Sequence, residues 1–497
     1  MLPDLAKLGP VLSMGGVAVL ILIWDFLPRS LLPRPRGAAL MTVALLGPAI
    51  AALWAGILLN NGERGFAFSN SMVLDDFSYF FLFLFAAIAA AIIFSSQGYD
   101  KRFEERQPEY YSLVLFATGA MMLLASSRDL ILIYIALELT GISQYVMSAL
   151  LRDPRSSEAG VKYLLLGAIA SAVILYGMAF LFGMTGTTRL VAPEGQPSIA
   201  TVIADRGSDM RAGLVLSVVF LIAGFGFKMA VVPFQMWVPD VYEGSPAPVA
   251  AFLSVASKAA GFAVVMRIFF EGLSDHQISS DWADIFAIVA AISMTVGNVL
   301  ALVQTNIRRL LGYSSIAQAG NFMVGMAAIS AGAGLSGGAS GVIFFLGAYA
   351  LTNLAAFIAV IAISDRTGSD QISDYAGMWQ RAPWLALALT LALVSLTGIP
   401  PTVGFIAKVY IFNAAIQSGG LVWLVVIAVL NSVISAFYYL RIAGSMFLSQ
   451  PVALERVQTS NALKLALTVA VAGILVLGII PTPLINAARD AAAVFAQ

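Results

Sequence analysis

Five ionisable side chains lie inside long apolar stretches of the 497-residue chain: Glu138, Lys162, Lys228, Lys258 and Lys408. A charged side chain at the centre of a membrane-spanning helix costs about 2.5–3.5 kcal/mol to insert, so such residues normally face a protein interior or a water-filled path. Amino and carboxyl groups held there can bind and release protons. Their positions therefore predict a path along which protons move.

Two of these lysines lie beside prolines. Lys228 precedes Pro233 in GFGFKMAVVP, and Lys408 follows Pro400 and Pro401 in GIPPTVGFIAK. Proline interrupts a helix, and broken backbone at membrane depth is tolerated only where it faces protein or a hydrated cavity. Both segments share the pattern Gly-Phe-x-x-Lys. We expect two discontinuous helices, one in each half of the chain, of the kind that marks transport sites.

Other readings stay open for some of these residues. Glu138 lies near the middle of its apolar run, where a carboxylate that only joins helices is the alternative to one that titrates. Lys162 lies near one end of its run and can extend its ammonium group to the membrane surface. Ser314, Gln318 and Asn321 share a helix face at i, i+4 and i+7. That polar stripe indicates either interhelical hydrogen bonds or a hydrated proton path.

The composition excludes a soluble protein. Hydrophobic residues make up 60% of the chain and charged residues 11%, whereas soluble domains carry roughly 25% charged residues. The chain has no cysteine and one histidine, His276, which excludes disulfides, thiolate-ligated metals and multi-histidine sites. Its 27 basic residues balance its 27 acidic ones, which argues against nucleic acid as a partner. We expect no metal and no redox cofactor on this chain.

The positioning elements are apolar runs long enough to span a bilayer, which needs about 20 residues. The sequence predicts an all-α integral membrane protein with about fourteen such helices, at 11–27, 38–59, 72–95, 110–127, 129–150, 159–184, 213–238, 247–270, 283–304, 308–329, 336–363, 383–414, 421–446 and 462–485. We expect the longest polar stretch, roughly 185–212, to be a loop. No segment resembles a domain outside the membrane.

The loops predict an orientation. One set of alternate loops carries most of the lysines and arginines, and such loops normally face the cytoplasm. This places both termini on the periplasmic side of a bacterial inner membrane, which requires an even number of spans.

Three segments carry a family resemblance. PFQMWVPDVYEGSPAPVAAFLSVASKAAGF, TGIPPTVGFIAK and IRRLLGYSSIAQAG resemble the signature stretches of the antiporter-like membrane subunits of respiratory complex I, the NADH–quinone oxidoreductase. Multisubunit cation/proton antiporters belong to the same superfamily. DVYEGSPAPV and the segment ending in Lys408 are most similar to the subunit N branch, whereas subunits L and M usually differ there. The resemblance covers nearly the whole chain.

The resemblance implies an architecture. Helices four to eight and nine to thirteen are expected to form two inverted five-helix repeats, with helices seven and twelve discontinuous. The corresponding divisions are an N-terminal three-helix segment at 1–109, the first repeat at 110–271, the second repeat at 272–446, and the last helix within 447–497.

The resemblance also implies roles for the buried charges. Glu138 and Lys228 match the family's switching pair, Lys258 its central connector and Lys408 its exit gate, and Lys162 matches its helix-six lysine. One departure concerns Gln318, where many relatives have histidine. Because an amide does not titrate, a relay past Gln318 must run over water.

The function implied is that of a non-redox subunit of a proton-translocating NADH:quinone oxidoreductase, coupled to quinone reduction elsewhere. NADH, FMN, iron–sulfur clusters and quinone are then expected in partner subunits, with antiporter-like subunit M and small subunit K as neighbours and lipids around them. The alternatives are a subunit of a cation/proton antiporter, a stand-alone transporter and a purely structural membrane arm.

Overall fold

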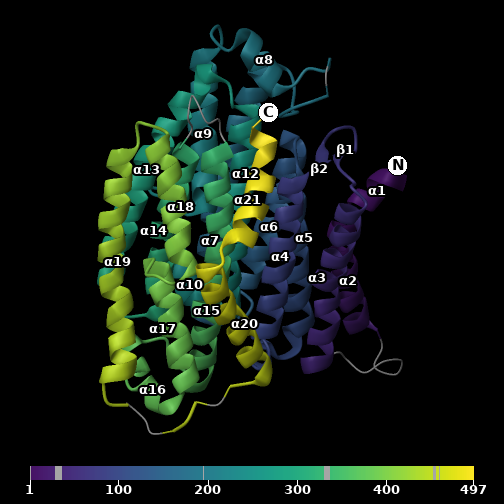
Figure 1. Cartoon of the computed structure of the whole chain (residues 1–497). Helices are drawn as coiled ribbons and strands as arrows, with labels where there is room; N and C mark the ends of the chain where they lie inside the picture. The colour runs from purple at the N-terminus through teal and green to yellow at the C-terminus, as the bar shows by residue number, and fades with distance from the viewer. Residues whose placement is uncertain are drawn as a thin grey trace.

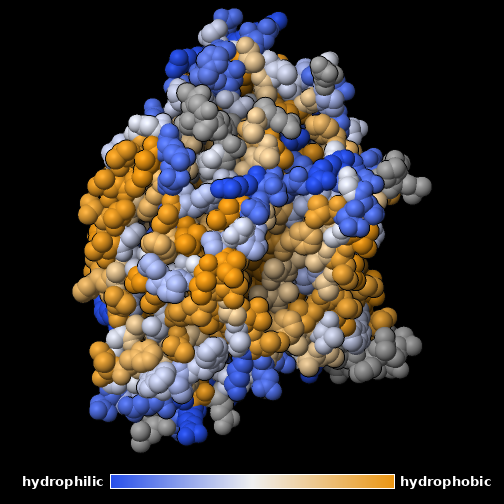
Figure 2. Space-filling view, in the orientation of Figure 1, coloured by the Kyte–Doolittle hydropathy of each residue, from blue (hydrophilic) through white to orange (hydrophobic). Residues whose placement is uncertain are grey.

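The structure is a computed structural model that describes residues 2–27, 36–193, 195–328, 336–451, 455–457 and 459–496. Its helices run roughly parallel in one bundle, and both termini lie toward the same end, which also carries the short helix α8 (Ile199–Arg206) (Figure 1). A belt of apolar side chains surrounds the middle of the visible face, with hydrophilic residues above and below it (Figure 2). This is the surface of a multi-pass membrane protein.

The N-terminal part combines helices with one small hairpin. Its elements are α1 (Leu2–Lys7), α2 (Gly9–Phe26), α3 (Gly37–Asn60), the antiparallel strands β1 (Gly65–Ala67) and β2 (Met72–Leu74), α4 (Asp76–Ser95) and the 3-10 helix η1 (Tyr99–Arg106). The prediction that a helix begins at 72 was wrong. Asp75 is extended and accepts a hydrogen bond from the Ser78 amide at 2.8 Å, so it caps α4 and ends the strand before it.

The middle of the chain contains the first broken helix. Its elements are α5 (Gln107–Ser126), α6 (Leu130–Ser148), α7 (Pro154–Thr185), α8, α9 (Arg211–Met229), α10 (Trp237–Gly244), α11 (Ala247–Phe252), the π-helix η2 (Leu253–Ser257), α12 (Lys258–Arg267) and the π-helix η3 (Ile268–Gly272). The stretch 185–212 is not wholly a loop, because Ser198 and Thr201 form a capping box that starts α8.

The C-terminal part contains the second broken helix. Its elements are α13 (His276–Leu302), α14 (Ile307–Ala327), α15 (Ser336–Thr367), η4 (Ile372–Tyr375), α16 (Met378–Arg381), α17 (Pro383–Thr397), α18 (Val403–Gln417), α19 (Val422–Leu448), α20 (Asn461–Ile479), α21 (Thr482–Ala492) and η5 (Ala493–Phe495). The apolar run 462–485 is interrupted near Pro481, where the amphipathic α21 begins.

These elements confirm an all-α membrane protein with discontinuous helices. In the part of the chain that the structure describes, twelve helical segments are long and apolar enough to span a membrane. That number omits α14, which carries the polar stripe, and the two short apolar halves α17 and α18. The count of fourteen spans stays a prediction.

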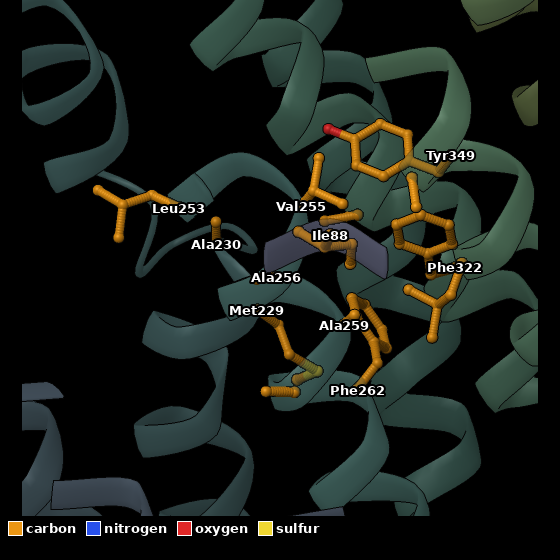
Figure 3. Packing of buried hydrophobic residues seen from close by; sticks show 14 of the residues in the cluster. Ile88, Met229, Ala230, Leu253, Val255, Ala256, Ala259, Phe262, Phe322 and Tyr349 are labelled. Carbon is orange, nitrogen blue, oxygen red and sulfur yellow. The ribbon is translucent and has the colours of Figure 1, made fainter. Parts of the chain in front are cut away.

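The segment from Ala247 to Gly272 lies at the centre of the bundle, and all of its most apolar window is buried. Figure 3 shows how it packs: Ala259 and Phe262 lie beside Met229 at the end of α9, and Val255 lies near Phe322 of α14 and Tyr349 of α15. Lys258 belongs to this segment, so its side chain is held inside the protein rather than against lipid.

Candidate functional site

The prolines singled out in the sequence lie in two helix breaks. Pro233 falls between α9 and α10, where Ala230 adopts a left-handed conformation with φ of 61°. Pro400 and Pro401 fall between α17 and α18, where Gly398 has φ of 89°. A Cβ at Gly398 would lie 2.8 Å from the Lys408 side chain, so glycine is needed there for its backbone conformation and for space.

Each break has a lysine near the carboxyl end of a half-helix, one by its position in the chain and one by the reach of its side chain. Lys228 belongs to the last turn of α9. Lys408 belongs to α18, but its side chain reaches back to α17, whose last residue is Thr397. Lys408 Nζ donates to the Thr397 carbonyl at 2.7 Å and to the Ser432 hydroxyl at 3.0 Å. Free carbonyls and the negative end of the helix dipole favour a cation at such an end.

The shared Gly-Phe-x-x-Lys pattern does not mark equivalent positions. Lys228 precedes its break, whereas Lys408 follows its own. The two ammonium groups also have different surroundings: Lys408 Nζ contacts the end of the preceding half-helix, whereas Lys228 Nζ lies near the Tyr145 ring of α6.

Glu138 lies close to the first of these lysines without touching it. Its carboxylate is half-buried and accepts a hydrogen bond from the Ser171 hydroxyl of α7. Lys228 Nζ lies 5.5 Å from the centroid of the Tyr145 ring. Among the ion pairs of the described residues none joins Glu138 to Lys228, so their charged atoms are more than 4.0 Å apart. The two side chains are therefore not in direct contact in this structure.

Lys258 lies at the start of α12, directly after the π-helix η2. Its side chain is buried, and its Nζ donates to the Ser315 carbonyl of α14 at 2.5 Å. Within the same π-helix, the Ser254 hydroxyl accepts a hydrogen bond from the Asn353 amide at 2.7 Å. Single π-helical turns are frequently found at functional sites.

Helix α14 connects the central lysine to the second break. Three residues after Ser315, the Gln318 side-chain amide donates to the Leu396 carbonyl at 3.0 Å. Leu396 precedes Thr397, whose carbonyl accepts the Lys408 hydrogen bond. Asn321 donates to Gln318 Oε1 at 3.1 Å, and Ser314 is hydrogen-bonded to the Tyr439 hydroxyl. The polar stripe on α14 thus faces the protein interior, and α14 contacts Lys258 through the Ser315 carbonyl and the end of α17 through Gln318.

Sequence reasoning missed the matching link in the first half. The fully buried Gln144 of α6 accepts hydrogen bonds at its Oε1 from the Tyr163 hydroxyl, at 2.9 Å, and from the Ser257 hydroxyl, at 3.2 Å. Ser257 is the residue before Lys258. The signal is weak because Gln144 is neutral, and neutral polar side chains commonly join membrane helices by hydrogen bonds.

Lys162 is placed apart from the other four. Its side chain is 43% exposed and pairs with Glu158 at 2.7 Å and with Asp240 of α10 at 2.9 Å. Asp240 in turn pairs with Arg309 at 2.7 Å. The structure therefore places Lys162 in a surface-accessible ion-pair cluster beside the first break, and not in the buried chain of contacts.

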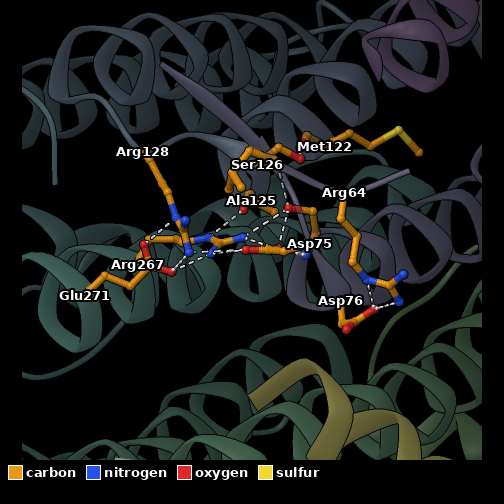
Figure 4. A network of polar contacts seen from close by, with 11 residues as sticks. Arg64, Asp75, Asp76, Met122, Ala125, Ser126, Arg128, Arg267 and Glu271 are labelled. Carbon is orange, nitrogen blue, oxygen red and sulfur yellow. Dashed lines mark hydrogen bonds and ion pairs between the residues drawn. The ribbon is translucent and has the colours of Figure 1, made fainter. Parts of the chain in front are cut away.

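A second buried charge cluster was also missed. Arg267, which is fully buried, binds both Asp75 oxygens and, at 2.5 Å, Glu271, while Arg128 binds Glu271 at 2.7 Å (Figure 4). Burial raises the pKa of Asp75, but the opposing charge and hydrogen bonds of Arg267 outweigh it, so this pKa lies below its ordinary value. Asp75 precedes α4 and lies outside the spanning segments. The cluster ties the end of the central segment to α4.

The described residues give no support for a metal site. Among the described residues, no group of three or more His, Cys, Asp or Glu side chains is placed to hold a metal ion.

Comparisons with known proteins support the resemblance. Residues 127–435 match the family described as NADH:quinone oxidoreductase/Mrp antiporter, transmembrane. The chain is 43% identical to the NADH-quinone oxidoreductase subunit N of Dehalococcoides mccartyi, over 94% of this chain and 95% of that protein.

Solved structures show the same fold. The chain resembles a chain of respiratory complex I from Thermus thermophilus with a TM-score of 0.77 and 31% identity, over 96% of this chain and 98% of that one. It also resembles a chain of the Mrp complex from Dietzia sp., with a TM-score of 0.84 over 99% of this chain and 97% of that one, but at 20% identity, which shows the fold alone. The protein therefore belongs to the NADH-quinone oxidoreductase subunit N branch of the NADH:quinone oxidoreductase/Mrp antiporter family.

Proposed function

We propose that this chain is a proton-translocating membrane subunit of an NADH–quinone oxidoreductase, and that protons move from the region of Glu138 and Lys228 through Lys258 to Lys408. The observation that carries the proposal is a series of contacts through α14. Lys258 donates to the Ser315 carbonyl, and Gln318 donates to the Leu396 carbonyl. The next carbonyl, that of Thr397, accepts the hydrogen bond from Lys408. Buried amino groups joined by a polar path are suited to proton transfer.

The pair of Glu138 and Lys228 acts as the switch. A carboxylate near a buried ammonium group favours the charged form, so Lys228 holds its proton while Glu138 is close and releases it when the two move apart. The hydrogen bond from Ser171 holds the Glu138 carboxylate toward α7 in the separated arrangement. Moving one charge against 100 mV costs about 2.3 kcal/mol, which is within the range that separating a desolvated pair can supply.

Lys258 is the connector, and water carries the proton between the fixed groups. Gln144 Nε2 and Asn321 Oδ1 are buried and have no hydrogen-bond partner among the described residues. Buried polar atoms are normally satisfied by protein or by ordered water, so these two atoms favour hydrated positions, one near Ser257 and one beside Gln318. Gln318 contributes a hydrogen bond rather than a titrating group.

Neighbouring subunits supply the driving reaction and cover the switch. Beside Glu138, the α6 residues Ile135, Leu139 and Ile142 are exposed. A half-buried carboxylate at membrane depth requires protein cover, because charged groups there are costly against lipid. We assign that cover to another membrane subunit, with subunits M and K as the candidates. NADH, FMN, iron–sulfur clusters and quinone then belong to partner subunits.

The proposed arrangement in the membrane follows the loop charges. Both termini and α8 face the periplasm, the ion-pair cluster of Lys162 faces the cytoplasm, and Lys408 exchanges its proton with the periplasmic side. The two inverted repeats occupy 110–271 and 272–446, after the N-terminal segment 1–109 and before the C-terminal segment 447–497. Lys162 serves at the cytoplasmic mouth rather than in the buried path.

A subunit of a cation/proton antiporter is the second candidate. The likeness to a chain of an Mrp complex favours it, but at 20% identity that likeness concerns fold. The 43% identity to a subunit N over nearly the whole chain favours the oxidoreductase.

The substitution Glu138→Gln in the assembled complex tests the switch. It keeps the size of the side chain and removes its charge, so we expect the number of protons pumped per electron to fall while assembly is kept. Glu455→Gln, at an exposed loop position, is the matched control. If Glu138→Gln pumped as many protons per electron as the wild type, the role of Glu138 would be structural and the proposed switch would be wrong.

A further inference from the structure

A groove runs down one face of the bundle between α4, α15 and α20. Its deeper part has a volume of about 300 Å³ and is lined only by apolar residues and glycine, among them Ile88, Phe94, Leu354 and Ala466. A wider part of about 540 Å³ adjoins it, toward α21. Both parts are lined by Leu84, Gly347 and Leu351, so they form one continuous groove.

Small side chains on all three helices keep the groove open. They are Ala87, Ala90 and Ala91 of α4, Gly347 and Ala350 of α15, and Ala466 and Ala470 of α20. In Figure 2 the apolar belt is hollowed between α20 and α4, with hydrophilic residues across the upper end of the hollow. The hollow therefore opens toward lipid along its length and toward water at one end.

The groove is long enough to hold a whole acyl chain. From Asp76 at its mouth to Phe94 at its far end, α4 rises by roughly 27 Å at 1.5 Å per residue. The hydrocarbon core of a bilayer is about 30 Å thick, so one leaflet accounts for about 15 Å. The groove therefore extends past the middle of the membrane, and an acyl chain that enters at the mouth lies in it along its whole length.

The mouth carries charges of both signs. Arg64 donates to Asp76 through Nη2 at 2.5 Å and through Nε at 3.1 Å, and it is about half exposed. The exposed Asp490 lines the same mouth and takes part in no ion pair among the described residues. The charged residues that line the opening are thus one arginine and two carboxylates, and one of the carboxylates has no ion-pair partner among the described residues.

We propose that this groove binds a zwitterionic phospholipid with a phosphoethanolamine headgroup. The phosphate lies against Arg64, whose remaining N–H groups are free to donate, and the ammonium group lies against Asp490. One acyl chain fills the apolar groove. An anionic lipid without an ammonium group places its negative charge beside two carboxylates and leaves Asp490 without a partner.

Filling the groove tests the site for the chain. We expect Ala466→Phe, in the purified intact complex, to abolish labelling of α4 and α20 by a phosphatidylethanolamine that carries a photoreactive group on its acyl chain. Ala472→Phe, an exposed position of α20 outside the groove, is the matched control and keeps the labelling. Equal labelling of the two variants would overturn the site.

The headgroup is tested separately, with Asp490→Asn and the exposed Arg206→Asn as its control. We expect Asp490→Asn to weaken labelling by the phosphatidylethanolamine probe and to strengthen labelling by a phosphatidylglycerol probe, because one of the two carboxylates that repel an anionic lipid is removed. Stronger wild-type labelling by phosphatidylglycerol would overturn the headgroup assignment. Cross-linking of groove residues to another subunit, with no lipid labelling in the wild type, would show that protein occupies the groove. None of these results depends on proton pumping.

Discussion

At the scale of single residues, the proposed proton path depends on what each buried polar group contacts. Lys258 and Lys408 both donate to backbone carbonyls, and in the described residues neither pairs with a carboxylate. The neutral amine and the ammonium form of lysine both have N–H groups that can donate to a carbonyl. Each lysine therefore keeps its hydrogen-bond partner in both protonation states. These two side chains can therefore change charge without losing their positions.

Gln318 provides a test at this scale. Gln318→Leu removes the donor to the Leu396 carbonyl and leaves that group unsatisfied, at a cost of about 1–3 kcal/mol. We expect the transfer step to slow by about tenfold or more, since 1.36 kcal/mol corresponds to a factor of ten in rate. The measurement is coupled proton pumping by the assembled complex in vesicles.

Gln318→His is the companion variant, because histidine retains a donor and can titrate. It should pump as well as the wild type. Pumping by Gln318→Leu at the wild-type rate would show that this amide is no part of the path.

The sequence revealed the charged residues of the candidate site but not their neutral partners. Lys228, Lys258 and Lys408 stand out because a charge within an apolar run is costly, and Pro233 and Pro401 stand out because they interrupt helices. Gln144 and Ser257 gave no such signal, since neutral polar residues are common in membrane helices. Only the packing of α6 against the central segment shows what they join.

At the scale of elements, the helix ends and breaks position the site. The central segment is α-helical around two π-helical turns, one before Lys258 and one at Glu271. The second turn lies in the cluster of Arg267, Asp75 and Glu271, which fixes the segment against α4. No local sequence pattern predicts that cluster, because Asp75 and Arg267 are far apart in the chain and meet only in the folded bundle.

Asp75→Asn tests whether the cluster of Arg267, Asp75 and Glu271 stabilises the protein. It leaves the fully buried Arg267 with only part of its compensating charge, and breaking a buried pair costs about 3–5 kcal/mol. We expect the complex to denature at a lower temperature than the wild type in detergent. Asp76→Asn, next to it but in a half-exposed pair with Arg64, is the control and should change little.

The contribution of this cluster to stability depends on pH, in a direction that follows from the pKa of Asp75. Because the pKa of Asp75 lies below its ordinary value in the folded protein, its contribution to stability is full above the unfolded pKa of about 3.9 and is lost as the pH falls through the folded value. The difference in denaturation temperature between wild type and Asp75→Asn should therefore shrink at acid pH. A difference that stayed constant down to strongly acid pH would contradict this role.

At the scale of the whole molecule, the sequence predicted the class and the general order of the helices. It overestimated the length of two runs, because Asp75 and Pro481 divide segments that hydrophobicity alone joins. Both termini lie toward the same end of the bundle, as an even number of spans requires (Figure 1). The lysines and arginines of the loops predict which side of the membrane that end faces.

The orientation can be measured directly, because the chain has no cysteine. We expect a single cysteine in place of Asp205 on α8, or of Ala496 at the C-terminus, to react with a membrane-impermeant maleimide added to intact cells. A cysteine in place of Arg366, which is exposed at the end of α15, should react only in inside-out vesicles. The reverse pattern would contradict the proposed topology.

The central claim is that Lys258 passes protons from the region of Lys228 to Lys408. The most direct test of this claim is to measure the number of protons pumped per electron by a complex that carries Lys258→Met. Methionine keeps much of the length and removes the titrating amine, while Lys464→Met, at an exposed position of α20, controls for the loss of a lysine. We expect the Lys258→Met complex to assemble normally but to pump fewer protons per electron than the Lys464→Met complex. Normal assembly with undiminished pumping per electron would contradict it.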